Sequence, residues 1–204
     1  DTMNFLRAGA EVTAVDLSEA SLALAQQRAK VYGFRDVRFI HSSIEDLGEV
    51  LEVEPYDLVY SFGVIHHTPY PWKAVRSARD YMGPASTFKM MVYNRRSLKA
   101  LGLRLRGGIE GLYNPDAAIA RQSEAQAGCP VTHTYTKDSV TALLERYFVV
   151  DSIGVEHIFP YRVADYVEHR YVREWYYDIM HPAVFDWLEH QFGWHLCVTA
   201  RVSP

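Results

Sequence analysis

Short apolar runs alternate with helical stripes through the first half of the chain. Four runs have the composition of strands: residues 11–15, 37–40, 56–62 and 87–93. Between them, Ser18 can cap one helix, and Pro71 can open another, which ends near Gly83-Pro84. Such an alternation predicts an α/β fold, with a mostly parallel sheet and helices on both of its faces.

The second half is less regular and richer in aromatic residues. The patterns predict helices over 94–108, 115–127 and 136–147, a strand over 148–158, a long aromatic helical stretch over 163–192 broken at Pro182, and a last strand over 194–202. We therefore expect residues 1–160 and 194–204 to form one sheet domain. Residues 161–193 would be an aromatic helical insertion, acting as a lid, a dimer face or a small core of its own.

Composition narrows the class of protein without naming it. The 204 residues carry a net charge of −4, which gives no reason to expect nucleic acid as a partner. Cys129 and Cys197 form no CxxC pair, which argues against a disulfide framework or a cysteine zinc site and favours a reducing cytoplasm. No apolar run reaches the roughly 18–20 residues that a membrane span needs.

Polar residues follow the ends of two predicted strands. Asp16 ends the first run, directly before a capped helix, and Ser43-Ile44 follow the second. Ligands of open α/β sheets bind outside these strand ends, where a carboxylate can accept hydrogen bonds from both hydroxyls of a ribose. A helix-capping aspartate and an ordinary strand-to-helix turn remain open as alternatives.

The most informative segment runs from Tyr56 to Pro69. A buried strand leads into Gly63, where backbone can approach a ligand closely, and then into the pair His66-His67. The segment resembles the fourth-strand motif of class I S-adenosylmethionine-dependent methyltransferases, in the small-molecule branch that includes enzymes of ubiquinone and menaquinone biosynthesis. The resemblance covers residues 1–93 well and the later elements only by their order.

This resemblance implies a Rossmann-like doubly wound sheet with an antiparallel last strand, and S-adenosylmethionine as cofactor. Asp16 matches the ribose-binding acid of the family, whereas Ser43 stands where the family usually has aspartate. The predicted cofactor contacts are Asp16, Leu17, Ser43, Ile44, Phe62 and Gly63. The predicted acceptor pocket comprises Val64, His66, His67, Tyr93 and Tyr161, with His67 as the candidate catalytic residue and a small molecule as the methyl acceptor.

One part of the family pattern has no counterpart in this sequence. The first strand of the family and its glycine-rich loop would precede Asp1-Thr2. Because that loop packs against the methionine part of the cofactor, we expect this chain to bind S-adenosylmethionine weakly by itself. Gly83-Pro84 stands where the family has a Gly-Gly turn before its fifth strand.

Other readings of the sequence remain open. The basic stretch 94–108 is either a solvated helical face or a site of peripheral membrane contact. His66 and His67 are adjacent and belong to no HxH or HxxxH pattern, so we predict no metal site. The rival functions are a nicotinamide-dependent oxidoreductase, for which no YxxxK pair follows the fourth strand, and a non-catalytic binding module. The sequence does not predict an oligomeric state.

Overall fold

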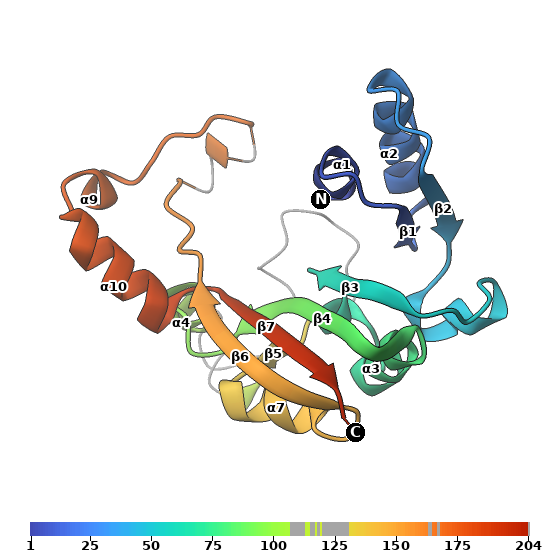
Figure 1. Cartoon of the computed structure of the whole chain (residues 1–204). Helices are drawn as coiled ribbons and strands as arrows, with labels where there is room; N and C mark the ends of the chain where they lie inside the picture. Colours follow the sequence, from blue (N-terminus) through green and yellow to red (C-terminus); the bar gives the residue numbers. More distant parts are fainter. Residues whose placement is uncertain are drawn as a thin grey trace.

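The computed structural model describes residues 1–106, 113–114, 117, 119, 131–162, 165–166 and 168–203. Two parallel strands, β1 (Val12–Asp16) and β2 (Val37–His41), form a small sheet. A five-stranded sheet contains β3 (Tyr56–Phe62), β4 (Met82–Asn94), β5 (Thr134–Tyr135), β6 (Phe148–Glu156) and β7 (His195–Val202). Its order is β3-β4-β7-β6, with β5 beside β4 (Figure 1).

The helices connect these strands in the alternating order that the sequence predicts. They are α1 (Thr2–Arg7), α2 (Glu19–Val31), α3 (Pro71–Asp80), α4 (Leu98–Arg106), α7 (Lys137–Leu144), α9 (Trp175–Asp178) and α10 (Pro182–Phe192), with 3₁₀ turns η1 (Ile44–Glu49) and η2 (Ile65–His67). Ser18 caps α2 and Thr136 caps α7, each accepting a backbone N–H through its hydroxyl. Both caps lie where the sequence predicts them.

The main core lies between the larger sheet and the helices α3 and α7. Phe88 of β4 is fully buried, and its ring stacks on that of Phe148 of β6 at a centroid distance of 4.8 Å. Val75 of α3 and Leu144 of α7 cover the same face and are also fully buried. Burial of these apolar side chains supplies the main free energy that holds the sheet and its helices together.

The topology confirms the predicted α/β class and its Rossmann-like arrangement. β3 pairs with β4 in parallel, and β7 pairs antiparallel with both β4 and β6. The antiparallel strand is therefore the last one in the sequence, as the family resemblance implies. It lies inside the sheet, between two strands that precede it along the chain.

Two local predictions differ from the structure. The strand predicted over 87–93 begins earlier, at Met82, so Gly83-Pro84, which stand where the family has a turn, lie within β4. Pro84 is tolerated there because the β3–β4 register shifts between Tyr56 and Leu58, so the ladder is irregular at this point.

The second difference concerns the aromatic helical stretch predicted over 163–192, with a break at Pro182. The break is present, since α10 begins at Pro182, but the part before it is only partly helical. Among the described residues of this stretch, helix occupies 165–166, 175–178 and 182–192, and the segment before α9 turns back on itself. Tyr161 forms an antiparallel bridge with Arg173, and the N–H of Arg162 donates to the carbonyl of Val172 at 2.9 Å. Closely spaced aromatic residues suit a strand as well as a helix, so their spacing alone did not separate the two.

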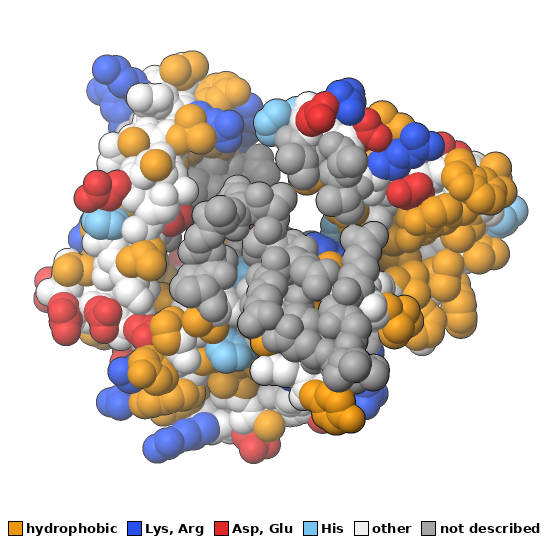
Figure 2. Space-filling model, turned by 180° about the vertical axis from the view of Figure 1, so that it is seen from behind, with side chains coloured by type: hydrophobic (Ala, Val, Ile, Leu, Met, Phe, Trp, Pro, Cys, Tyr) orange, Lys and Arg blue, Asp and Glu red, His pale blue; other side chains and the backbone are white. Residues whose placement is uncertain are grey.

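The helices α9 and α10 lie at the end of the molecule opposite β2, where α10 packs against β6 (Figure 1). Many apolar side chains of this end remain exposed, among them Trp175, Ile179 and Trp187. From behind, Figure 2 shows hydrophobic side chains gathered there.

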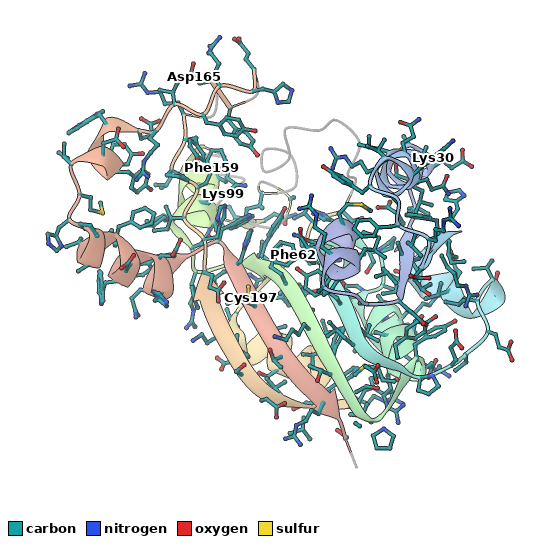
Figure 3. All side chains as sticks on the ribbon, turned by 45° about the horizontal axis from the view of Figure 1, so that its top comes forward. Lys30, Phe62, Lys99, Phe159, Asp165 and Cys197 are labelled. Atoms are coloured by element: carbon teal, nitrogen blue, oxygen red, sulfur yellow. The ribbon has the colours of Figure 1, made fainter. Side chains whose placement is uncertain are left out.

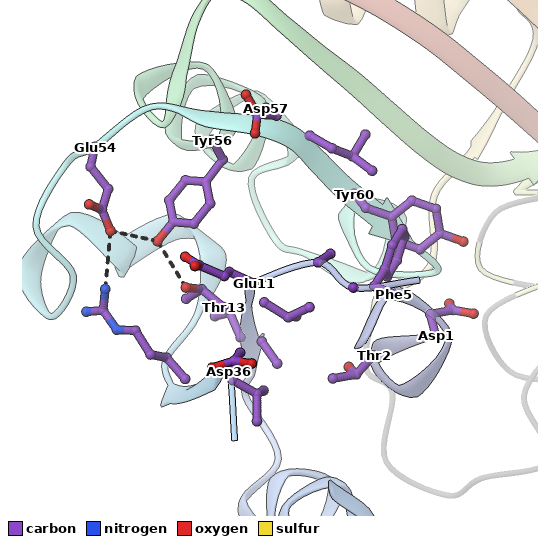
Figure 4. Close-up of a pocket in the computed structure, with 18 of the residues that line it drawn as sticks. Asp1, Thr2, Phe5, Glu11, Thr13, Asp36, Glu54, Tyr56, Asp57 and Tyr60 are labelled. Atoms are coloured by element: carbon purple, nitrogen blue, oxygen red, sulfur yellow. Dashed lines mark hydrogen bonds and ion pairs between the residues drawn. The ribbon is translucent and has the colours of Figure 1, made fainter. Parts of the chain in front are cut away.

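A wide cavity of about 960 Å³ separates the two sheets, between β1 and β3 (Figure 4). The described residues include no strand between these two, although both present an edge to the cavity. Among the contacts that span the separation, Thr13 Oγ1 lies 3.0 Å from the Tyr56 hydroxyl, the Phe5 ring meets the Tyr60 ring edge-on at 5.1 Å, and Arg38 pairs with Glu54 at 3.2 Å.

Candidate functional site

A second cavity, of about 410 Å³, lies where the carboxyl ends of β1, β2 and β3 converge. Its volume falls within the range of ligand pockets in proteins. The predicted site residues that line it are Asp16, Leu17, Ser43, Ile44, Gly63, Val64 and His67. Residues from three strand ends, far apart in the sequence, thus meet at one place, as expected for an open α/β sheet.

Asp16 is held in a defined orientation at the end of β1. One carboxylate oxygen, Oδ1, accepts the backbone N–H of Ser18 at 2.8 Å. The second oxygen has no hydrogen bond to another described residue, and Asp16 is exposed on the cavity wall. The residue therefore stabilises a local turn through one oxygen and can accept a ligand hydroxyl through the other, so both readings of the sequence apply to it.

Ser43 and Ile44 occupy the wall contributed by β2. The Ser43 hydroxyl accepts the backbone N–H of Glu45 at 3.1 Å and so caps the 3₁₀ turn η1. Ile44 begins that turn, and the N–H groups at the start of a helical turn have no carbonyl acceptor within the turn. Backbone N–H groups are therefore the better-placed donors to a ligand on this wall, and the Ser43 side chain serves the turn.

Gly63 directs the chain from β3 into the η2 turn. Its φ is +80°, a left-handed conformation that side-chain-bearing residues rarely adopt. A Cβ at this position would meet only Met91 Cε, at 3.8 Å, so the backbone conformation and not lack of space requires glycine. Immediately beyond, Ile65 and His66 are fully buried and anchor the turn, which fixes the next residue, His67, at the cavity.

His67 is held by a segment that lies far away in the sequence. Its Nδ1 lies 3.0 Å from the carbonyl oxygen of Val131 and 3.3 Å from the hydroxyl of Thr132. The backbone N–H of His133 donates to the carbonyl of His66 at 2.8 Å, so residues 131–133 run alongside η2. The imidazole is thereby fixed in both position and orientation.

Ser61 was not among the predicted site residues. It lines the cavity, is buried, and its hydroxyl oxygen has no hydrogen-bond partner in the described part of the structure. An unpaired buried hydroxyl is uncommon and is explained most simply by a ligand group that pairs with it. The residue lies inside a nearly continuous apolar run, and nothing in that pattern distinguishes it from core.

We expect Ser61→Ala to leave the unfolding free energy unchanged or slightly raised, because no hydrogen bond of the unliganded protein is lost. Ligand affinity should fall by about 2- to 10-fold, the value of one neutral hydrogen bond. Urea unfolding and calorimetric titration with S-adenosylmethionine measure the two effects separately. A loss of stability without a loss of affinity would assign the hydroxyl to the fold.

Four predicted site residues lie outside the lining of this cavity. Phe62 points to the other face of β3, where its ring meets His195 edge-on at 5.6 Å. His66 is buried behind the cavity wall, 4.0 Å from the Tyr93 ring, and Tyr93 stacks on Trp194 at 4.2 Å. Tyr161 takes part in the bridge to Arg173.

Histidine rings that are buried to different degrees continue this stack behind the site. Burial, and then the charges of neighbouring histidines, chiefly His67 and His195, hold the pKa of His66 well below its usual value. Burial, followed by His157 and Lys99, lowers the pKa of His195 to about 4. Burial also lowers the pKa of His157, whose ring stacks on His195 at 4.5 Å. These rings are therefore neutral at pH 7.

The basic stretch 94–108 contributes to the fold through two of its cations. The Arg95 guanidinium donates to the Thr134 carbonyl at 2.9 Å. Lys99 Nζ lies 4.8 Å from the Trp194 ring centroid and 6.0 Å from that of Phe159 (Figure 3). Residues 107 and 108 lie outside the described part of the chain, as does most of the predicted helix over 115–127.

The fold and the strand-end cavity define the class of this chain as a Rossmann-like methyltransferase fold. A solved S-adenosylmethionine-dependent methyltransferase of Clostridium acetobutylicum has a TM-score of 0.60 at 9% identity, covering 100% of this chain and 79% of that chain. The 1,6-didemethyltoxoflavin-N1-methyltransferase of Burkholderia thailandensis, solved with S-adenosylhomocysteine, has a TM-score of 0.58 at 16% identity, covering 100% and 66%. A cyclase shares the fold too, with a TM-score of 0.59 at 14% identity, covering 94% and 65%.

Residues 1–88 match the family model described as a methyltransferase domain. This match confirms the resemblance predicted from the strand-end motifs. A ubiquinone biosynthesis O-methyltransferase of Nitrosococcus oceani is 28% identical over 94 residues, 46% of this chain and 39% of that protein. An uncharacterized protein of Synechococcus sp. is 28% identical over 134 residues, 62% of this chain and 31% of that protein. The matches thus cover between three and four tenths of the length of these relatives.

None of the helices in the described part of the chain is both long and apolar enough to cross a bilayer.

Proposed function

We propose that this chain is the cofactor-binding part of an S-adenosylmethionine-dependent methyltransferase that acts on a small molecule. One observation supports this most directly. Asp16, Leu17, Ser43, Ile44 and Gly63, which the family resemblance assigns to the cofactor, come from three different strand ends and line one cavity of about 410 Å³. The match of residues 1–88 to the methyltransferase-domain family supports the same assignment.

The residues of the cavity suit the chemistry of this cofactor. The second oxygen of Asp16 is available to a ribose hydroxyl, and the backbone at Ser43-Ile44 can address the adenine edge. Leu47, Val59 and Tyr81 give the cavity apolar walls, and Ser61 adds one unpaired hydroxyl. When bound, S-adenosylmethionine supplies a methyl group already activated by its sulfonium, so these residues need to orient the reactants and exclude water.

The acceptor would approach from the side of Val64 and His67, on the turn after β3. Because this turn and the strand ends of β1 and β2 line the same cavity, cofactor and acceptor would share it. The enzyme would be cytoplasmic, in keeping with its use of cysteine, and the basic stretch 94–108 could contact a membrane surface. Residues 161–193 would form a separate aromatic insertion, since none of its described residues lines the strand-end cavity. A nicotinamide oxidoreductase is not favoured, since residues 1–88 match a methyltransferase-domain family.

We expect Asp16→Asn to weaken S-adenosylmethionine binding by about 1.5–3 kcal/mol, roughly 10- to 150-fold in Kd. Asparagine preserves the oxygen that accepts the Ser18 N–H, so the turn and the fold should persist. The amide nitrogen that replaces the second oxygen cannot accept a hydrogen bond from the ribose, and the negative charge is lost. Isothermal titration calorimetry on the whole protein measures the change.

Asp57→Asn is the matched control. Asp57 is an exposed aspartate of β3 that lines the wider cavity between the sheets and not the strand-end cavity. Its variant should bind the cofactor with unchanged affinity. Equal cofactor affinities for the Asp16→Asn variant and the unaltered protein would contradict the ribose assignment. If the protein binds the cofactor but transfers no methyl group to any acceptor, a binding module or a cyclase-like activity would be favoured.

A further inference from the structure

A slot separates the two sheets at the level of their strands, between β1 and β3. The wider cavity, of about 960 Å³, extends from it toward α1, and the strand-end cavity, of about 410 Å³, extends toward α3 and η1. Figure 1 shows α1 and α3 on opposite sides of β3. Five residues of the two strands line both cavities: Thr13, Val15, Tyr56, Leu58 and Tyr60. The slot is therefore bordered by open space on both of its sides.

The strands on the two sides of the slot run in the same direction. Asp16 and Gly63, at their carboxyl ends, line the strand-end cavity, whereas Glu11 and Glu54, before their amino ends, line the wider one. Among the described residues, β1 is hydrogen-bonded only to β2, and β3 only to β4. Both strands therefore present a row of backbone N–H and C=O groups to the slot.

Apolar side chains are left uncovered beside the slot. Strands of a parallel sheet are usually buried on both faces, yet no residue of β1 is buried, and Leu58 and Tyr60 of β3 are 36% and 38% exposed. On the side of α3, the strand-end cavity ends on Leu47, Leu51 and Tyr81, which belong to a small apolar core. An occupant with apolar side chains on both faces would remove these surfaces from water.

The amino end of the slot is acidic. The acidic residues that line this end of the wider cavity are Glu11, Asp36, Glu54 and Asp57 (Figure 4). Two arginines, Arg35 and Arg38, line the cavity as well, and Arg38 pairs with Glu54 at 3.2 Å. Acidic side chains thus outnumber basic ones here, so the slot favours an occupant that carries positive charge at this end.

The hydrogen-bonding edges favour an extended chain over other occupants. Neighbouring strands lie about 4.7–4.9 Å apart, and a strand between β1 and β3 could pair with both of them through its two edges. A helix is about 10 Å wide and has its backbone groups bonded internally, so it would leave both edges unpaired. A small apolar molecule would cover the walls and leave the edges equally unpaired.

We propose that the slot between β1 and β3 binds an extended segment of a partner protein, with basic residues at its amino end followed by about five apolar residues, the length of β1. The segment runs parallel to both strands, which places its basic end beside Glu11 and Asp57. Its side chains point alternately toward α1 and α3. On binding, the two sheets become one. This inference does not depend on the proposed methyl transfer.

Binding of a synthetic peptide to the whole protein tests the proposal. The probe is a fluorescein-labelled peptide of two lysines followed by five alternating valines and leucines, and fluorescence anisotropy measures its Kd. We expect it to bind at least about 10-fold more tightly than a peptide with two glutamates in place of the lysines. Proline at the central position should weaken binding by a similar factor, since it removes an N–H and cannot pair with strands on both sides.

A charge reversal in the protein shows whether the acidic end of the slot reads the peptide. Glu11 and Asp57 are both exposed, so the double variant Glu11→Lys with Asp57→Lys should fold. We expect this variant to prefer the glutamate peptide over the lysine peptide. Glu145→Lys is the matched control, because Glu145 is an exposed acid that caps the end of α7 and lines neither cavity. Its preference should match that of the unaltered protein.

Hydrogen exchange of the backbone amides identifies where the peptide binds. Bound peptide should slow exchange in β1 and β3 by at least about 10-fold and leave the amides of β6, which borders the other end of the larger sheet, unchanged. Equal binding of the lysine, glutamate and proline peptides, or protection of β6 instead of β1 and β3, would overturn the inference. Strong protection of β1 and β3 before any peptide is added would mean that the slot is already filled, and would overturn it too.

Discussion

Gly193→Ala should lower the free energy of unfolding by about 3 kcal/mol, although the change adds a single methyl group. A Cβ at this position would lie 2.5 Å from the Glu156 carbonyl carbon and 2.6 Å from the Glu189 carbonyl oxygen. Both are backbone atoms, one at the end of β6 and one in the last turn of α10, so neither can rotate away. Relief requires α10 to move from the sheet.

The backbone around Gly193 joins several elements, which raises the cost of such a movement. Its N–H donates to the Glu189 carbonyl at 2.8 Å, and its carbonyl accepts the buried Asn94 amide at 2.9 Å. The next residue, Trp194, donates its N–H to the His157 carbonyl at 2.7 Å. A shift of α10 would strain all three of these hydrogen bonds simultaneously.

Urea denaturation followed by circular dichroism measures the effect. The urea concentration at the midpoint should fall, while the dependence of the unfolding free energy on urea concentration stays unchanged. Gly102→Ala is the matched control, since Gly102 lies in α4 and a Cβ there would meet no atom within 4 Å. Alanine is the better helix former, so this variant should be unchanged or up to about 1 kcal/mol more stable. Equal stability of the Gly193→Ala variant would mean that α10 is not docked against β6 as described.

Acidification from pH 7 to pH 4 should destabilise the protein through His195 by roughly 2 kcal/mol. In the unfolded chain the pKa of this ring has its ordinary value of 6.5. In the native protein, burial and then the charges of His157 and Lys99 lower the pKa to about 4. The unfolded state therefore binds more protons as the pH falls below 6.5, and stability is lost across that interval. The full shift would correspond to about 3 kcal/mol, which solvent screening of the part-exposed ring reduces.

His195→Phe isolates this contribution from the titration of carboxylates. Phenylalanine keeps a ring against Phe62 and His157 but cannot be protonated. Across the same pH interval, the variant should lose about 2 kcal/mol less stability than the unaltered protein, measured by urea midpoints at each pH. Loss of the His195 charge should also ease protonation of the buried ring of His66, which changes the difference in the same direction. Parallel pH profiles for the two would contradict the assignment.

The strands and capped helices were predictable because each of their signals is local. The β1, β2 and β3 runs are apolar over the lengths of strands, and Ser18 and Thr136 precede helices that they cap. Residues 161–174 were not predictable in the same way. Their aromatic side chains suit either a strand or a helix, and the choice depends on the tertiary contacts between Tyr161 and Arg173.

The residues of the site were predictable from the sequence to different extents, for the same reason. Asp16, Ile44 and Gly63 could be predicted because they directly follow strands whose ends converge in any open α/β sheet. The contact between His67 and the Val131 carbonyl could not be predicted, since Val131 lies 64 residues away along the chain. Nothing in the sequence around Val131 marks it as a partner of His67. Ser61 was equally hidden, because an unpaired hydroxyl becomes informative only when its burial is known.

The place of β7 in the sheet bears on how the protein is made in the cell. β7 comes after β4 and β6 in the sequence yet lies between them, so nothing joins those two strands until residues 195–202 have left the ribosome. During synthesis the nascent chain carries two unsatisfied strand edges and uncovered apolar faces, which favour association with other chains. The sheet can close only after β7 is translated, so these strand edges and apolar faces stay uncovered until that point of synthesis.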